Sequence, residues 1–282
     1  MVNDQVNNLD KLEAVPSEEV LDAFGVKGEL VHLEGGQGTC YRVGDVVFKP
    51  AGNKAGAIWL AELNNGITSN DFRVPKSYKA NDGSWVYQGW TATEFLEGEH
   101  RAGRYKEAIK VCKDFHQVIA DIPKPDFFDQ RSDVFFIADK MAWGELPLTN
   151  YALTDEPLKK LFSIYKDLNL PNQVIHGDWG TGNILFDDKL PPAVIDVSPY
   201  YRPADFPIAV MMIDAMVYEN ADQSILDLGK GLKDFDQLLL RAVARRICEY
   251  IGHQLHPEND QDRNPEIIKH LKLMDLIISK VE

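Results

Sequence analysis

The chain has 282 residues, of which 44% are hydrophobic, so it is long enough to form two compact units with cores of their own. It carries 44 acidic residues against 30 basic ones, and the formal charge of −14 argues against nucleic-acid binding, which requires a basic surface. The three cysteines, Cys40, Cys112 and Cys248, are far apart in the sequence, which argues against a disulfide framework or a zinc site.

No segment of the chain has the composition of a membrane or targeting signal. The N-terminal residues lack the basic stretch followed by an apolar run that marks a signal peptide. The longest apolar run, 206–218, contains Asp214 and is too short to cross a bilayer. We therefore expect a cytoplasmic protein that does not bind membranes.

The first hundred residues are rich in β-prone runs bounded by turn residues. A short helix over 16–24, capped by Ser17, precedes them, and a helix over 53–65 with Asn53 as its cap interrupts them. Five such runs predict the strands of an antiparallel sheet: 30–34, 39–43, 46–50, 72–78 and 85–92.

A glycine cluster, Gly35, Gly36, Gln37 and Gly38, lies between the first two predicted strands. Glycine lets the backbone approach phosphate oxygens closely and supplies free N–H donors. An ordinary turn is the alternative. Lys49, at the end of the third strand, favours the phosphate interpretation because its cation would reach the same phosphates.

The helix predicted over 53–65 carries a carboxylate, Glu62, on the same face as Ile58 and Trp59 by the three-to-four residue period. A carboxylate on an apolar face requires a partner, and Lys49 is the expected one. A solvated helix carboxylate is the alternative.

The remainder of the chain is predominantly helical in pattern. Helical periodicity predicts helices over 105–119, 158–168, 208–217, 236–255 and 265–280. A flexible, aromatic-rich connection is expected over 123–150. The basic cluster Arg241, Arg245 and Arg246 is interpreted as a solvated or salt-bridged helix face.

The most informative stretch is 174–196. It contains His176-Gly177-Asp178, then Asn183 five residues after the aspartate, and Asp196 at the end of the next apolar run. Phosphoryl transfer requires one carboxylate to accept the proton of a hydroxyl group, and an amide and a second carboxylate to hold Mg²⁺. A hairpin with polar loop residues is the alternative, but it accounts poorly for the whole ordered set.

These motifs, in this order from about Leu30 to about Val210, resemble the aminoglycoside phosphotransferase-like family, small-molecule kinases of the protein-kinase-like fold. The resemblance implies an α+β fold with two lobes. Residues 1–92 would form a small nucleotide-binding lobe with a five-stranded antiparallel sheet and one helix. Residues 93–98 would be the hinge, and 99–282 a larger, mainly helical lobe with the catalytic loop and the acceptor site.

The resemblance also assigns roles to the residues of the catalytic stretch. Asp178 would be the catalytic base, and Asn183 and Asp196 would be ligands of Mg²⁺. His176 would be structural and would fix the catalytic loop by hydrogen bonds. Asp205 matches an acidic residue of the family, although a helix cap is its simpler explanation.

Nucleotide binding is assigned by the same resemblance. Lys49 would clamp the phosphates of ATP or GTP, and Glu62 would anchor this lysine. The cluster 35–38 would cover the phosphates, and the hinge, through Glu94 and Leu96, would bind the base.

Three departures separate the chain from protein kinases. The metal-binding aspartate lies in Asp196-Val197-Ser198 and not in Asp-Phe-Gly, and the chain contains no Ala-Pro-Glu. The cluster 35–38 also lacks the spacing of the Gly-x-Gly-x-x-Gly loop. We therefore expect no activation segment and no platform for a peptide substrate.

Together these features predict an ATP- or GTP-dependent phosphotransferase that uses Mg²⁺ and acts on a hydroxyl group of a small molecule. An aminoglycoside or amino sugar is the expected acceptor, since an acidic protein favours a cationic ligand. The alternatives are a metabolic kinase for a sugar or amino alcohol, and a catalytically silent nucleotide-binding regulator. The identity of the acceptor, the choice between ATP and GTP, and the oligomeric state are left open.

Overall fold

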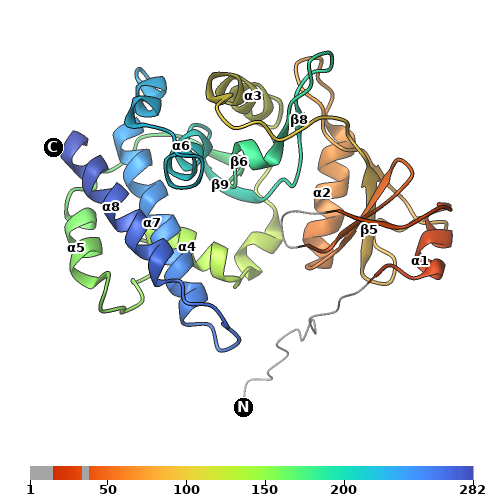
Figure 1. Ribbon diagram of the computed structural model, residues 1–282, viewed down its shortest axis with the longest axis horizontal. Helices are drawn as coiled ribbons and strands as arrows, with labels where there is room; N and C mark the ends of the chain where they lie inside the picture. The colour runs from red at the N-terminus through yellow and green to blue at the C-terminus, as the bar shows by residue number, and fades with distance from the viewer. Residues whose placement is uncertain (1–14, 34–37, 282) are drawn as a thin grey trace. The chain divides into compact units, whose positions relative to one another are not determined.

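The computed structural model describes residues 15–33 and 38–281, and the chain divides into two compact units (Figure 1). The smaller unit comprises Met1–Thr68 and Arg73–Glu97, and the larger one comprises Ser69–Phe72 and Gly98–Glu282. Of the glycine cluster, Gly35, Gly36 and Gln37 lie outside the described residues.

The smaller unit is built on a five-stranded antiparallel sheet in the order β1-β2-β3-β5-β4, which confirms the sheet predicted from the sequence. Its strands are β1 (Val31–Leu33), β2 (Cys40–Val43), β3 (Val46–Pro50), β4 (Ser77–Tyr78) and β5 (Trp90–Glu94). The two residues left between the runs predicted over 39–43 and 46–50 form a tight turn, since Val43 pairs with Val46 and Gly44 has a positive φ of 57°.

The last two strands are shorter than the sequence suggested. The run predicted as one strand over 85–92 is broken by a tight turn at Gln88 and Gly89, whose φ angles are 44° and 82°. Tyr87 and Trp90 exchange both backbone hydrogen bonds across this turn, at 3.0 and 2.9 Å, so β5 begins only at Trp90. In the other run, Pro75 has no N–H to donate, and β4 is limited to two residues.

Two capped helices flank the sheet. In α1 (Glu18–Ala23), the Ser17 hydroxyl accepts a hydrogen bond from the Val20 N–H at 3.3 Å, as predicted. In α2 (Lys54–Gly66), the Asn53 carboxamide accepts one from Gly56 at 3.1 Å. Val20 of α1 is buried in one apolar cluster with strand residues including Val43 and Phe48.

The carboxyl end of α2 is fixed by the segment that leads into β4. The Lys76 ammonium donates to the carbonyl oxygens of Asn64 and Ile67 at 2.9 and 2.6 Å, and a cation at this end of a helix is favourable. The Asn65 carboxamide exchanges two hydrogen bonds with the backbone of Ser77, at 3.1 and 2.8 Å. These contacts attach α2 to the edge of the sheet.

The larger unit is mainly helical, as expected. Its α-helices are α3 (Tyr105–Val118), α4 (Val134–Ala142), α5 (Asp155–Ser163), α6 (Phe206–Tyr218), α7 (Phe235–Gln254) and α8 (Asn264–Val281). Short 3₁₀ helices lie at Asp126–Gln130, Thr181–Asn183 and Gln223–Gly229. No helix of the described ranges has both the length and the apolar composition that a membrane span requires.

Helix α7 packs against α4, α6 and α8 (Figure 1). The prediction of a flexible connection over 123–150 is wrong, because this segment contains α4. Asp133 caps α4 by accepting a hydrogen bond from the Phe136 N–H at 3.0 Å. Phe136, Ala138 and Ala142 are buried, so the aromatic content of the segment reflects packing.

Helix α5 starts and ends earlier than predicted. The Asp155 carboxylate accepts a hydrogen bond from the Tyr151 N–H at 2.8 Å, which fixes the backbone just before the helix. After Ser163, side chains of α7 bind the backbone of Lys166 in place of helical hydrogen bonds. The Gln237 carboxamide accepts from the Lys166 N–H at 2.8 Å, and Arg241 donates to the Lys166 carbonyl at 3.0 Å. The residues 164–168 therefore leave the helix.

Two short antiparallel ribbons hold the segment of greatest interest in the larger unit. Strand β6 (Asn172–His176) pairs with β9 (Pro199–Pro203), and β7 (Ile184–Leu185) pairs with β8 (Ala193–Val194). The sequence did not predict β9. Together the ribbons fix the backbone on both sides of 177–183 and of 195–198.

Candidate active site

The segment between β6 and β7 is a tight loop that begins at Gly177. The Gly177 N–H donates to the Ser198 carbonyl at 2.8 Å, which continues the β6–β9 pairing by one residue. A Cβ atom at this glycine would lie 2.2 Å from the buried Tyr200 ring. Only glycine therefore fits immediately before Asp178.

Two buried histidines fix the backbone of this loop by hydrogen bonds. His176 Nδ1 accepts hydrogen bonds from the N–H groups of Asp178 and Ser198 at 3.4 and 3.3 Å, and its Nε2 donates to the Ile195 carbonyl at 3.3 Å. The His176 N–H in turn donates to His116 Nε2 at 3.0 Å, and His116 Nδ1 donates to a helix carbonyl of α3 at 2.7 Å. Burial lowers the pKa of His176 to about 4 and that of His116 to about 3, so both rings are neutral with fixed tautomers.

His176 therefore ties the loop that carries Asp178 to the segment that carries Asp196. This is the structural role expected for it from the sequence. The rest of the loop is anchored on its other side. The buried Trp179 indole donates to the Ala108 carbonyl of α3 at 3.2 Å, and the Thr181 hydroxyl donates to the Glu219 carboxylate at the end of α6.

Asp178 keeps an accessible carboxylate within this rigid frame. Its side chain is 42% exposed, whereas the flanking Gly177 and Trp179 are buried. One oxygen, Oδ1, accepts a hydrogen bond from Arg246 Nη2 at 2.7 Å. Burial disfavours the charged carboxylate, but the charge of Arg246 outweighs burial and holds the pKa of Asp178 below its usual range.

Asn183 lies beside Asp178 and points its amide nitrogen at it. Asn183 Nδ2 donates to the Asp178 carbonyl at 2.6 Å and to Asp178 Oδ2 at 3.3 Å. The carbonyl of Asn183 accepts from the Ile195 N–H at 3.0 Å, so Asp196 follows directly after the residue bonded to Asn183. The β7–β8 ribbon thus brings Asp178, Asn183 and Asp196 to adjacent stretches of backbone.

Asn183 and Asp196, the residues predicted to bind Mg²⁺, carry an amide oxygen and a carboxylate, which are oxygen ligands of the kind this ion prefers. Because Nδ2 of Asn183 is bound to Asp178, the amide oxygen is the atom that would face a cation. Asp196 is exposed and has a positive φ of 52°, which is unusual for a residue with a side chain. Within 15–33 and 38–281, no group of three or more His, Cys, Asp or Glu residues is arranged to hold a metal ion. Mg²⁺ requires few protein ligands, because it completes an octahedron with phosphate and water oxygens.

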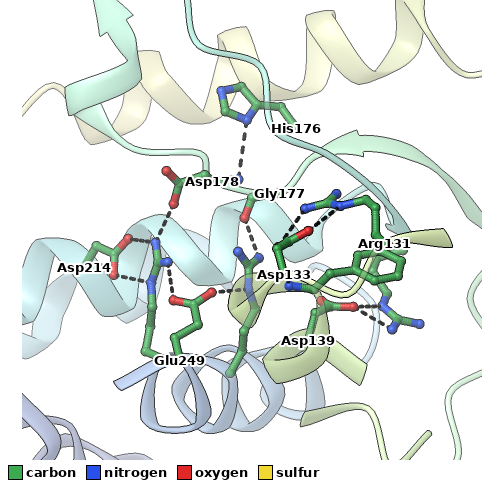
Figure 2. Close-up of polar contacts among 12 residues, drawn as sticks. Arg131, Asp133, Asp139, His176, Gly177, Asp178, Asp214 and Glu249 are labelled. Carbon is green, nitrogen blue, oxygen red and sulfur yellow. Dashed lines mark hydrogen bonds and ion pairs between the residues drawn. The ribbon is translucent and has the colours of Figure 1, made fainter. Parts of the chain in front are cut away.

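A buried ionic cluster next to Asp178 was missed from the sequence. Figure 2 shows the carboxylates of Asp178, Asp214 and Glu249 converging, and they share the guanidinium of Arg246. The sequence predicts a solvated or salt-bridged helix face for the basic residues of α7. Arg245 and Arg246 are salt-bridged, but Arg245 is buried and only 12% of the Arg246 side chain is exposed. Arg241 is buried as well and donates to backbone carbonyls instead. The available signal was Asp214, a lone carboxylate in an apolar helix, which requires a partner.

A cavity of about 230 Å³ opens onto this cluster, lined by residues of α4, α6 and α7. Its aromatic side chains are Phe135, Tyr218 and Tyr250, and its charged side chains are Asp214, Arg246 and Glu249. The cavity thus draws on the segment 123–150 and on the helices after Asp205.

In the smaller unit, Lys49 lies on β3 opposite Thr91 of β5, and its side chain is exposed. Gly38 has a positive φ of 66°, and its carbonyl accepts a hydrogen bond from His32 Nε2 at 2.8 Å. The conformation of Gly38 is one that glycine adopts readily, in keeping with a turn at the end of the glycine cluster.

The expected ion pair between Lys49 and Glu62 is not among the ion pairs of the described residues, and Glu62 is exposed. The buried positions near the end of α2 are Ala61, Leu63 and Asn64, so the side that faces the interior differs from the predicted one. Helix α2 is apolar over much of its length, and its pattern therefore did not identify the buried side.

The residues predicted to form the hinge extend the hydrogen bonding of the sheet. The Glu94 N–H donates to the Lys76 carbonyl at 2.8 Å, and its carboxylate accepts from the Lys76 N–H at 3.4 Å. The Phe95 N–H donates to the Asp45 carbonyl at 2.8 Å, and Leu96 is buried. The side chain of Leu96 thus belongs to the core, and any contact of Leu96 with a ligand would be made by its backbone.

With this geometry established, comparison with known proteins identifies the class. The model of the phosphotransferase enzyme family matches residues 57–197, half of the chain, and the chain belongs to this family. The chain is a phosphotransferase of the protein-kinase-like fold, as the resemblance implied. A search of curated protein sequences finds no match.

Solved structures agree with this assignment of the fold. A choline/ethanolamine kinase family protein from Mesorhizobium loti shares 14% identity, covers 90% of this chain and 89% of its own, and has a TM-score of 0.60. A spectinomycin phosphotransferase bound to ADP and spectinomycin shares 16% identity over 91% and 92% of the two chains, with a TM-score of 0.56. The GDP and kanamycin complex of APH(2″)-IIia shares 15% identity over 93% and 97%, with a TM-score of 0.58.

Proposed function

We propose that this protein transfers the γ-phosphoryl group of ATP or GTP to a hydroxyl group of a small cationic molecule, with Mg²⁺ as the cofactor and Asp178 as the catalytic base. Family membership supports the reaction class. The observation that carries the proposal is the grouping of Asp178, Asn183 and Asp196 around the β7–β8 ribbon, because it unites the proton acceptor with a Mg²⁺ donor set.

Asp178 would act mainly by orienting the acceptor. Its carboxylate is ionised and 42% exposed, so a hydroxyl group can donate a hydrogen bond to it. A carboxylate of low pKa is a weak base, but the transition state of phosphoryl transfer is loose and requires little proton transfer before the bond to phosphorus forms. Positioning of the hydroxyl for in-line attack is then the larger contribution.

The nucleotide would be bound by the residues assigned from the resemblance. Lys49 would neutralise the phosphates, the cluster Gly35–Gly38 would cover them with N–H groups, and Glu94 and Leu96 would meet the base. Glu62 remains proposed as the anchor of Lys49 in the nucleotide-bound form. Mg²⁺ on Asn183 and Asp196 would neutralise the charge that develops on the phosphates. The solved structures with ADP and with GDP support keeping both nucleotides as candidates.

The acceptor is proposed to occupy the cavity of α4, α6 and α7. Asp178 and the cavity are connected through Arg246, which contacts the first and lines the second. Three aromatic side chains suit a cation such as an aminoglycoside or amino sugar, since the face of an aromatic ring attracts a cation. The carboxylates of Asp214 and Glu249 are paired with arginines, and they would serve as hydrogen-bond acceptors for its hydroxyl and amino groups. The likeness to a choline/ethanolamine kinase family protein favours a second candidate, an amino alcohol.

The test is a transfer assay with ATP and GTP against kanamycin, spectinomycin, glucosamine, choline and a neutral sugar. Phosphorylated product with one of the cationic acceptors is expected. Asp178→Asn should lower kcat by about 10²–10⁴-fold and leave nucleotide affinity nearly unchanged. Asp188→Asn, at an exposed aspartate paired with Arg101 on the surface, is the matched control and should retain activity.

A catalytically silent regulator would give a different pattern. It would bind Mg²⁺-nucleotide yet neither hydrolyse it nor transfer phosphate to any acceptor. Full activity of Asp178→Asn would remove this residue from the mechanism. Turnover of only the neutral sugar would keep the phosphotransferase and remove the cationic acceptor.

A further inference from the structure

Two neighbouring arginines of α7 contact consecutive residues of the loop that carries the proposed base. Arg245 is buried, and only 12% of the Arg246 side chain is exposed. We infer that Arg246 is a positioning residue for Asp178, and that this arginine pair sets the geometry of the catalytic loop. The inference rests on the proposed function, since it requires Asp178 to take part in transfer.

Arg246 distributes its guanidinium over three carboxylates from three parts of the chain. It binds Asp214 of α6 through two nitrogens, with Nε to Oδ1 at 2.9 Å and Nη2 to Oδ2. Nη1 donates to Glu249 Oε2 at 2.7 Å, and Nη2 also donates to Asp178 Oδ1 at 2.7 Å. The two-point contact with Asp214 fixes the plane of the guanidinium, and the direction in which Nη2 meets Asp178 is fixed with it.

Arg245 holds the same loop one residue earlier and through the backbone. Its Nη1 donates to the Gly177 carbonyl at 2.6 Å, and its Nε donates to Glu249 Oε1 at 2.8 Å. The guanidinium lies 4.4 Å from the centre of the Tyr200 ring, the ring that excludes any side chain at Gly177. Glu249 bridges both arginines, so the pair behaves as one rigid unit (Figure 2).

The sequence around Asp178 explains why a distant helix is used. The residue before Asp178 is a glycine that has no side chain to offer, and the steric limit at Tyr200 prevents any other residue there. The orientation of the carboxylate must then come from elsewhere in the fold. Arg246, 68 residues away in sequence, is the cation that supplies it.

This arrangement makes the two oxygens of Asp178 unequal. Oδ1 is held by Arg246 at 2.7 Å, whereas Oδ2 receives only a long contact from Asn183 at 3.3 Å. Arg246 has 12% of its side chain exposed, against 42% for Asp178. Oδ2 is therefore the oxygen that would meet the acceptor hydroxyl, and its direction depends on Arg246.

A lysine cannot reproduce these contacts. Its ammonium is a point charge without the planar fork, so it would keep the charge near Asp178 but lose the two-point contact with Asp214. Arg246→Lys thus tests the geometry of the contact with Asp178 while a positive charge stays near this carboxylate. Arg202→Lys is the matched control, because Arg202 is also buried and forks onto Asp139 while it contacts Glu145, yet it touches no residue of the catalytic loop.

The experiment is a double-mutant cycle on phosphoryl transfer. The wild type, Arg246→Lys, Asp178→Asn and the double variant are assayed with Mg²⁺ and ATP or GTP, using the best acceptor among kanamycin, spectinomycin, glucosamine and choline, or water if none turns over. We expect Arg246→Lys to lower kcat by about 10–10²-fold while the acceptor KM changes less than about threefold. In the Asp178→Asn background the same change should lower kcat less than about threefold, because its target is gone.

Each outcome decides one question. A wild-type kcat for Arg246→Lys, with a melting temperature lowered as in Arg202→Lys, would reduce Arg246 to a structural role and overturn the inference. Equal effects of Arg246→Lys with and without Asp178 would overturn it as well. Wild-type turnover by Asp178→Asn would overturn the proposed function, and the inference with it.

A second variant covers the case in which Arg246→Lys fails to fold. Asp214→Asn keeps the size of the side chain and leaves Arg246 in place, but it weakens the contact that fixes the guanidinium plane. At saturating acceptor, kcat should fall by about three- to tenfold, and this loss should vanish in the Asp178→Asn background. An unchanged kcat would overturn the inference.

Discussion

At the scale of single residues, the site depends on which atom of a side chain is already engaged. Asn183 is the clearest case, since its nitrogen is bound to Asp178 and its oxygen is thereby directed elsewhere. His176 is another, because its Nε2–H tautomer follows from two N–H donors on Nδ1 and a carbonyl on Nε2. Such orientations require no ligand to be present and so prepare the site for one.

Loss of one proposed metal ligand should act on nucleotide binding only when Mg²⁺ is present. We expect Asp196→Ala to raise the Kd of Mg²⁺-nucleotide by at least about tenfold. Removal of a residue that only orients a metal ligand already lowers metal affinity by about 10–100-fold, and removal of the ligand itself should cost at least as much. Calorimetric titration with and without Mg²⁺ measures this. Without Mg²⁺ the variant and the wild type should agree, and Asp188→Ala should match the wild type throughout. A loss of affinity that is independent of Mg²⁺ would remove Asp196 from the metal site.

The residues recovered from the sequence are those that lie close together along the chain. Asp178, Asn183 and Asp196 fall within 19 residues, so one local pattern contains them all. Arg246 and Asp214 reach the site only through the packing of α6 against α7, and the residues next to them in the sequence do not indicate this contact. For Glu62 the local pattern was insufficient, because α2 is apolar over much of its length and the pattern could not identify its buried side.

At the scale of elements, caps and turns were predictable because their chemistry is local. Ser17 and Asn53 cap α1 and α2 as expected, and Gly44 turns β2 into β3. Strand β9 was not predictable, because it begins and ends with proline, which cannot donate a backbone hydrogen bond and so argues against a strand. The Gln88-Gly89 turn was missed because apolar and aromatic residues on both sides of it, 85–87 and 90–92, resemble one continuous strand.

Gly177 links β6, β9 and the loop that carries Asp178, and it should be intolerant of any side chain. In Gly177→Ala the Cβ would lie 2.2 Å from the Tyr200 ring, and we expect a loss of about 1–3 kcal/mol in the free energy of unfolding, together with reduced transfer. Urea denaturation and the transfer assay measure both effects. Gly182→Ala is the control, since its added Cβ would meet open space. Wild-type stability of Gly177→Ala would show that Tyr200 moves freely, and the loop would then be less rigid than described.

At the scale of the whole molecule, the larger unit combines a buried ionic cluster with three buried histidines. His116, His176 and His270 are at most 2% exposed, and burial lowers the pKa of each, to about 3, 4 and 4 respectively. The ionic cluster can carry charge because its arginines and carboxylates pair with one another, whereas each histidine ring must stay neutral. The folded state of this unit is therefore most stable at pH values at which histidine is uncharged.

Stability should therefore fall as the pH decreases below about 6.5. In that range the unfolded chain takes up protons on these histidines, whereas the folded chain binds them only near pH 4 and below, so acid favours unfolding. Each histidine contributes a slope of about 1.4 kcal/mol per pH unit, about 4 kcal/mol for the three together, and the slope levels off once the pH reaches the folded pKa values. Urea midpoints at pH 7.5, 6.5, 5.5 and 4.5 measure it. His270→Asn should reduce the slope by about one third, whereas His256→Asn, at an exposed position, should leave it unchanged. A slope that is the same in His270→Asn and the wild type would show that His270 is protonated without cost, and the pH dependence would then have another origin.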